Sequence, residues 1–338
     1  MEYVVIIFLY LAILLYVVLG GADFGAGIIE MFTSAKNIKR MRKTLYHAIG
    51  PIWEANHMWL IIAIVILFVG FPLIYSQLSV YLHIPLVIML MGVIARGTAF
   101  VFRHYDAVHD EMQSVYNKVF VGSSFITPFF LGVIAGSAVS GNIDTEASNF
   151  VDAYIFSWLN AFSIAVGIFM VSLCGFLASV YLIGESESDN DRQRFVRKAK
   201  RMNIMAVIAG AIVFIAATMD QVPLVDWVFG DPVGLVSVFL ASVSLAMMWR
   251  NINSRIVMLP RMLAAFQVTM ILLAITYAHF PNFVIFADGE QLSLLENAAP
   301  EKTINSLGWA LLIGSFFILP ALFYLYYSFQ KQEIGGYE

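Results

Sequence analysis

Residues 50–60 read GPIWEANHMWL, and residues 61–70, IIAIVILFVG, carry no charged or hydrogen-bonding side chain. A run of this length and polarity is typical of a helix that crosses a membrane. A charge inside the hydrocarbon costs at least about 2.5 kcal/mol, and residues that carry one there are usually functional. Glu54 is therefore a candidate functional residue if the segment around it spans a membrane.

The composition indicates an all-α integral membrane protein. Of the 338 residues, 60% are hydrophobic and 12% are charged, and the mean hydropathy of +0.82 is well above that of an ordinary soluble domain. The sequence has no Walker-type phosphate loop and no dinucleotide fingerprint, which argues against ATP-driven transport by this chain. A disulfide or a Cys-x-x-Cys site needs two cysteines, so the one cysteine, Cys174, is expected to pack in its apolar run.

Nine apolar stretches are long enough to span a membrane as single helices of about 20 residues. They lie at about 3–33, 46–74, 79–103, 115–139, 154–183, 203–219, 232–249, 262–280 and 305–329. The first stretch has no signal-peptide cleavage pattern, so we expect it to remain as a span. We interpret residues 1–338 as one polytopic membrane domain, with a first half at about 1–139 and a second half at about 154–338.

Basic residues set the expected orientation. The connections after spans one, three, five and seven, together with the C-terminal tail, hold all but two of the 19 Lys and Arg residues. Of these two, Lys302 lies in an opposite connection and Arg96 lies within a span. The positive-inside rule then predicts an N-terminus outside the cell and a cytoplasmic C-terminus. The longest basic connection, residues 185–201, is predicted to form a short interfacial helix that joins the two halves.

Three charged residues on successive spans are predicted to lie at similar depth. At 1.5 Å per residue from the cytoplasmic span ends, Asp23 lies roughly 15 Å deep, Glu54 about 12 Å and Arg96 about 10 Å. One base does not neutralise two acids, so such a site could pass protons. The alternative is that Arg96 pairs with one acid only to fix helix packing. Gly21 and Gly25, which flank Asp23, predict the close approach of a neighbouring helix.

Asn56 and His57 extend the polar start of the second span. His57 lies three residues after Glu54 and shares a helix face with it, whereas Gly50 and Pro51 weaken the backbone ladder just before them. We expect a wetted cavity that opens toward the cytoplasm here. The six histidines do not occur in paired ligand motifs, and a single Glu-x-x-His is a weak signal, so no metal or haem site is predicted in this chain.

Three motifs together resemble subunit II of the cytochrome bd-type quinol oxidases. They are Gly21-Ala-Asp23-Phe-Gly25-Ala-Gly27, then Gly50-Pro51-Ile-Trp53-Glu54-Ala-Asn56-His-Met-Trp59-Leu60, then Arg96-Gly-Thr-Ala-Phe100-Val-Phe-Arg103, in the family's order and spacing. The nine-span layout agrees over the whole length, whereas the second half matches only in hydropathy and topology. Many members carry Asp where this chain has Glu54, so the acid is kept and is one methylene longer.

The resemblance implies a fold of two four-helix bundles plus one peripheral helix, and a heterodimer with subunit I in a prokaryotic cell membrane. In that family subunit I binds two b-type haems, one d-type haem and the quinol, and subunit II binds none of them. The complex oxidises quinol, reduces dioxygen to water with cytoplasmic protons and so generates membrane potential. A small single-span subunit is a further candidate partner, and no nucleic acid is expected.

The resemblance also implies roles for individual residues of a subunit that is not catalytic by itself. In the family, the acid at the position of Glu54 belongs to a proton path that leads toward the haems. The residues expected to line this path are Glu54, Asp23, Asn56 and His57, and those expected to support it by charge pairing or packing are Arg96, Arg103 and Trp53.

An ion-coupled secondary transporter is the alternative function, since intramembrane carboxylates beside an Arg and broken helices also suit ion-coupled transport. The sequence shows no paired glycine-broken helices at corresponding places in its two halves. A haem-bearing partner that copurifies with the chain would distinguish an oxidase subunit from a transporter.

Overall fold

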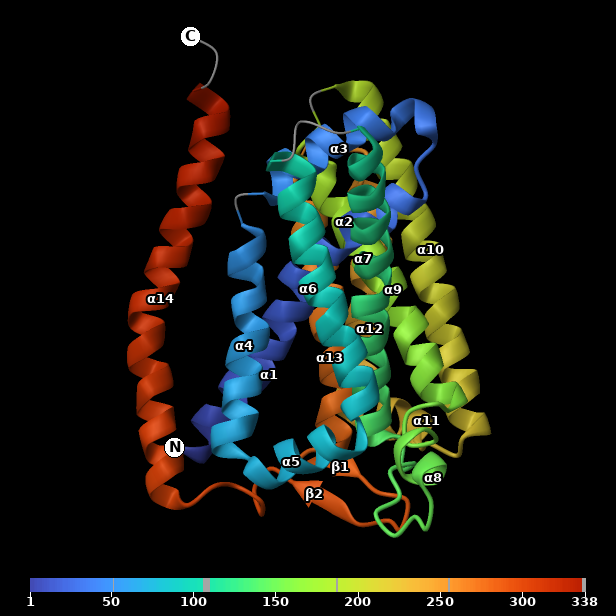
Figure 1. Ribbon diagram of the computed structural model, residues 1–338, viewed down its shortest axis with the longest axis vertical. Helices are drawn as coiled ribbons and strands as arrows, with labels where there is room; N and C mark the ends of the chain where they lie inside the picture. The colour runs from blue at the N-terminus through green and yellow to red at the C-terminus, as the bar shows by residue number, and fades with distance from the viewer. Residues whose placement is uncertain (51, 106–109, 187, 255, 336–338) are drawn as a thin grey trace.

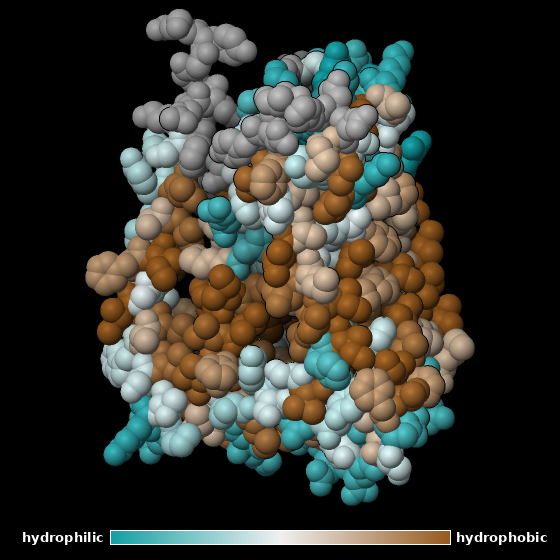
Figure 2. Space-filling model, viewed as in Figure 1, coloured by the Kyte–Doolittle hydropathy of each residue, from teal (hydrophilic) through white to brown (hydrophobic). Residues whose placement is uncertain are grey.

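Long apolar helices make up most of the computed structural model, which describes residues 1–338 except 51, 106–109, 187, 255 and 336–338. Nine helical segments of the described chain are long and apolar enough to cross a membrane, as the sequence predicts. Most run roughly along the long axis in Figure 1. On the face shown in Figure 2, hydrophobic residues form a broad band and hydrophilic residues gather at both ends. The fold is therefore that of an all-α membrane protein.

The first span is a composite of three helical pieces. α1 (Glu2–Leu15) leads into a π-helical turn, η1 (Tyr16–Gly20), which continues as α2 (Gly21–Met31). Such turns are rare and occur frequently at functional sites. This one comes shortly before Asp23 and shifts the direction in which the side chains of α2 point relative to those of α1.

The other spans of the first half are α4 (Trp53–Gly70), α6 (His83–Tyr105) and α7 (Asp110–Val139). Two further helices, α3 (Ala35–Ile49) and α5 (Pro72–Tyr81), lie at opposite ends of the bundle (Figure 1). The predicted span at 46–74 is wrong at its start, because residues 46–49 end the basic helix α3. Hydropathy hides this break, since residues 46–49 read YHAI and differ little from a span. Pro51, predicted to weaken the helix here, lies outside the described residues.

The second half contributes α9 (Ala161–Leu182), α10 (Asp189–Met219), α12 (Pro232–Asn251), α13 (Met258–His279) and α14 (Glu301–Gly335). The short helix predicted at 185–201 is wrong as a separate element, because α10 runs without a break into the sixth span. Ser188 caps α10 by accepting a hydrogen bond from the backbone N–H of Asp191 at 3.2 Å. The two aspartates of the first turn stabilise this end of the helix, because it is the positive end of the helix dipole. One helix thus carries both the charged and the apolar turns.

Short elements close the end of the molecule opposite α3. β1 (Asn282–Ile285) and β2 (Gln291–Ser293) form an antiparallel pair, and Ile143 bridges to Phe286 beside them. The short helices α8 (Phe150–Tyr154) and α11 (Leu224–Phe229) lie at this same end in Figure 1.

α14 lies at the periphery of the helical assembly. It packs mainly against α1 and α4, and Figure 1 shows it at one edge. Large side chains along it remain exposed, including Phe316 at 74% and Phe323 at 73%. This agrees with one extra helix outside two four-helix bundles. The division of the chain near residues 139–154 stays a prediction, and the main hydrophobic core includes residues from both sides of it.

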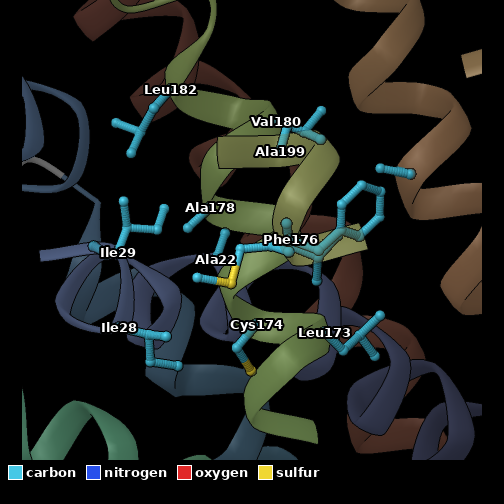
Figure 3. Packing of buried hydrophobic residues seen from close by; sticks show 14 of the residues in the cluster. Ala22, Ile28, Ile29, Leu173, Cys174, Phe176, Ala178, Val180, Leu182 and Ala199 are labelled. Atoms are coloured by element: carbon cyan, nitrogen blue, oxygen red, sulfur yellow. The ribbon is translucent and has the colours of Figure 1, made fainter. Parts of the chain in front are cut away.

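That core surrounds α9, against which α2 packs closely. Figure 3 shows Ala22, Cys174 and Ala178 where the two helices meet. Gly25 lies against the α9 backbone: a Cβ added to it would lie 1.9 Å from the Cys174 carbonyl oxygen and 2.6 Å from Ala178 Cβ. A side chain larger than hydrogen therefore cannot be placed at residue 25 without moving a helix.

We expect Gly25→Ala to destabilise the protein by about 1–3 kcal/mol, because the added methyl group overpacks a rigid helix contact. Gly122→Ala is the matched control, since nothing lies within 4 Å of a Cβ added there. Thermal unfolding of the purified protein in detergent measures both changes. Equal melting temperatures for the two variants would contradict the close α2–α9 contact.

Candidate functional site

A buried ion pair joins the first and third spans. The Arg96 guanidinium donates to both carboxylate oxygens of Asp23 at 3.0 Å and to its backbone carbonyl at 2.8 Å. Its Nε donates to Ser124 Oγ on α7 at 3.1 Å, and both charged side chains are only 1% exposed. A bidentate pair with extra hydrogen bonds is the arrangement that best offsets the cost of burying two charges. The site thus links α2, α6 and α7.

Aromatic rings enclose this pair. The guanidinium carbon of Arg96 lies 5.1 Å from the ring centre of Phe24 and 5.2 Å from that of Phe120. Rings within about 6 Å attract a cation through their electron-rich faces. Both charged side chains are almost fully buried, so the electrostatic attraction between Asp23 and Arg96 is screened little.

A second ion-pair cluster lies seven residues further along both helices. Glu30 on α2 accepts from Arg103 on α6 at 2.8 Å and from Arg42 on α3 at 2.6 Å, and its side chain is 1% exposed. Since α2 and α6 belong to spans one and three, they run in the same direction, and seven residues make two helical turns on each. Two acids on α2 therefore face two arginines on α6 in register.

Glu30 is the site residue that the sequence reasoning missed. It lies at the end of a predicted span, where an acid is easily taken for part of the membrane surface. The signal that could have found it is the shared spacing: Asp23 and Glu30 are seven residues apart, and so are Arg96 and Arg103. Equal spacing of opposite charges on two parallel helices predicts two pairs rather than one.

Lys198 of α10 adds a positive charge where α2 ends. Its ammonium donates to the Ile29 carbonyl at 3.1 Å and also to the Thr33 hydroxyl. Carbonyls in the last turn of a helix lack intrahelical donors, and a cation there is favoured by the helix dipole. The end of the first span that is predicted to face the cytoplasm therefore has its negative charge balanced by cations of α6 and α10.

Glu54 does not join these pairs. It lies in the first turn of α4, its side chain is exposed, and no hydrogen bond or ion pair joins it to another described residue. The expected grouping of Asp23, Glu54 and Arg96 at one depth therefore resolves into one buried pair and one outward carboxylate. Trp53, the residue before it, turns inward and packs on Phe100 with ring centres 5.4 Å apart.

His57 reaches the buried pair instead of sharing a site with Glu54. Its Nε2 lies 3.7 Å from Asp23 Oδ2, and its ring lies 6.0 Å from that of Tyr16, in the π-turn. His57 Nδ1 and the Tyr16 hydroxyl are buried and have no hydrogen-bond partner among the described residues. Buried polar atoms of this kind are the usual partners of ordered water. Asn56 is also buried, at 3% exposure.

The described residues contain no group of three or more His, Cys, Asp or Glu side chains that could hold a metal ion. Among the histidines in that part of the chain, His83 Nδ1 lies 2.8 Å from the Val80 carbonyl. His279 packs on the Trp227 ring with centres 5.3 Å apart. These two contacts place one histidine against a backbone carbonyl and the other against an indole ring.

The comparison with protein families decides the assignment. The family model described as cytochrome bd terminal oxidase subunit II matches residues 1–329. The chain belongs to this family. The solved structure of a bd oxidase from Geobacillus thermodenitrificans shares the fold, with a TM-score of 0.72 and 17% identity over 95% of this chain and 98% of that one.

Curated relatives agree with the family match. The cytochrome bd ubiquinol oxidase subunit 2 of Bacillus subtilis is 30% identical over 57% of this chain and 56% of its own length. The cytochrome bd-I ubiquinol oxidase subunit 2 of Escherichia coli K12 is 25% identical over 49% of this chain and 44% of its own. The chain thus spans about half the length of these relatives. A putative cytochrome bd menaquinol oxidase subunit II of Bacillus subtilis is 22% identical over 95% of this chain and 93% of its own.

Replacing Asp23 by Asn leaves Arg96 buried without a counter-charge, which costs about 3–5 kcal/mol. We therefore expect a large fall in the unfolding temperature of Asp23→Asn in detergent. Glu54→Gln is the matched control: it also removes one carboxylate, but an exposed one with no partner among the described residues, so it should not lower the unfolding temperature. An Asp23→Asn variant as stable as Glu54→Gln would show that the ion pair does not hold the helices.

Proposed function

We propose that this chain is the haem-free subunit II of a quinol:dioxygen oxidoreductase in a prokaryotic cell membrane. Its family, its nine spans and the names of its relatives support the assignment. In this proposal a partner, subunit I, holds two b-type haems and one d-type haem, oxidises quinol and reduces dioxygen to water. This chain supplies scaffold and a proton path, and none of its residues is catalytic.

The observation that carries the proton path is the difference between the two acids. The carboxylate of Asp23 accepts two hydrogen bonds from Arg96, and protonating it would leave that arginine unpaired in a buried site. Glu54 has no such partner and is exposed at the start of α4. Glu54 can therefore gain and lose a proton without breaking a structural contact, whereas Asp23 cannot.

The surface that carries Glu54 supports a protein partner on this side. Ile61 and Phe68 follow Glu54 at seven-residue steps on α4, and each is 60% exposed. Residues at this spacing lie on one helix face, so Glu54 stands at the end of an apolar strip. A charge facing lipid costs at least about 2.5 kcal/mol, and polar groups or water held by a partner would remove that cost. Glu54 would then pass protons across the interface toward the partner's haems.

His57, Tyr16 and Asn56 have a supporting role in this proposal. The polar atoms of His57 and Tyr16 that have no partner among the described residues suit ordered water. In this proposal, water molecules connect them to the basic end of the bundle. Trp53 and Arg103 hold the helices around that region by packing and by pairing with Glu30. Protons enter in this account from the basic end, which the positive-inside rule assigns to the cytoplasm.

In the purified complex, we expect Glu54→Gln to lower quinol-driven oxygen consumption at least about tenfold, because it removes a group that exchanges protons. The haem absorption spectrum and the yield of the complex should stay normal. Glu54→Asp should keep most of the activity, and Glu301→Gln, which removes another exposed carboxylate, should have no effect. Unchanged turnover in Glu54→Gln, or loss of the complex, would contradict the proton role.

The orientation can be tested with single cysteines, because the native Cys174 is buried. Lys39 on α3 and Glu290 beside β2 are both exposed and lie at opposite ends of the molecule. In intact cells, a membrane-impermeant maleimide should label Glu290→Cys and should label Lys39→Cys only after permeabilisation. The reverse pattern would place the basic end of the bundle outside.

A further inference from the structure

An apolar groove lies between α10 and α12, on the side of the molecule away from α14 (Figure 1). Its volume is about 340 Å³, and its walls include Ile204, Val207, Ile208 and Leu245. Val207 and Ile208 are each 55% exposed. The groove therefore opens toward the surroundings of the membrane span and not into the protein core.

Two hydrogen-bonded polar side chains, Asn203 and Trp249, form one end of the groove. Asn203 is only 4% exposed, and its Oδ1 accepts from the indole N–H of Trp249 at 2.8 Å. Lys200, one turn earlier on α10, places its ammonium 5.7 Å from the centre of the Trp249 ring. Indole rings and lysine side chains are typical of the level where hydrocarbon meets lipid headgroups. The groove thus begins at the membrane interface.

A basic pocket of about 410 Å³ lies next to this end. Arg192, Arg197 and Lys200 line it together with Gln193 and Asn253. None of the three cations is in an ion pair with a described carboxylate, since the nearby Asp191 pairs with Arg40 and Arg194. The pocket therefore has a net positive charge that nothing in the described part of the chain neutralises.

The two cavities adjoin where Lys200, which lines the basic pocket, lies against Trp249, which lines the groove. Together they have the length of one leaflet. Arg197 and Ile208 are eleven residues apart on a continuous helix, or about 16 Å at 1.5 Å per residue, and half of a hydrocarbon core is about 15 Å. Basic pockets between spans on the positive side of a membrane suit acidic headgroups. We propose that this site binds an anionic phospholipid, with its phosphate among Arg192, Arg197 and Lys200 and an acyl chain along Val207 and Leu245.

The test uses the intact complex, stripped of lipid in detergent and then supplied with phosphatidylglycerol or phosphatidylcholine. Native mass spectrometry should detect one phosphatidylglycerol molecule retained per chain and no comparable retention of phosphatidylcholine. Each basic group near an anionic surface contributes about a fivefold factor, so Arg197→Gln with Lys200→Gln should weaken retention about thirtyfold. Inorganic phosphate, which has no acyl chain, should compete poorly for the site.

Two further variants separate the charges from the groove. Lys36→Gln with Lys39→Gln removes two exposed cations from α3 at the same end of the molecule and should leave retention unchanged. Ala246→Phe fills the groove without changing any charge and should reduce retention of phosphatidylglycerol. The proposal would be overturned if the complex retained the two lipids equally, or if Ala246→Phe retained phosphatidylglycerol fully. It would also be overturned if the Lys36 and Lys39 double variant lost as much phosphatidylglycerol as the Arg197 and Lys200 double variant.

Discussion

The buried pair of Asp23 and Arg96 is the contact on which the first bundle depends. Two charges in a hydrocarbon layer are tolerable only when each satisfies the other, and this pair does so through both carboxylate oxygens. It draws α2 and α6 together and recruits α7 through Ser124. Glu30 and Arg103 repeat the arrangement two turns further on. These ion pairs hold one face of α2 against α6, and Gly25 on another face packs against α9. The main hydrophobic core surrounds that second contact.

The charged residues that hold the helices together are therefore different from Glu54, the exposed carboxylate. The four charged side chains of the two pairs are all almost fully buried, so a change in protonation at any of them would disrupt helix packing. Glu54 lies close to them in the sequence pattern but projects outward, where it has no role in holding α4. In the proposed function this separation lets a haem-free subunit serve its partner, because the residue proposed to move protons is not one that holds the fold.

Much of this arrangement follows from the sequence. The number of spans could be predicted, because hydrocarbon thickness sets helix length, and the depth count placed Asp23 and Arg96 near each other. Other features could not be predicted. The end of α3 at residue 49 leaves little trace in hydropathy, and the start of α10 reads as an interfacial helix because its first turns are charged. The direction of Glu54 was hidden because α4 is apolar on every side after His57, so no polar face along its length indicates how the helix is rotated. Glu30 was overlooked although its spacing from Asp23 matches that of Arg103 from Arg96.

The central claim is that Glu54, and not the paired Asp23, is the carboxyl group that exchanges protons during turnover. Infrared difference spectroscopy of the complex, recorded as it is reduced and reoxidised, tests this claim most directly, with isotope-labelled glutamate to identify the carboxyl bands. The account predicts a glutamic-acid band that appears in the wild type, moves on labelling and is absent in Glu54→Gln. A band that persists in Glu54→Gln, or that carries no glutamate label, would contradict it.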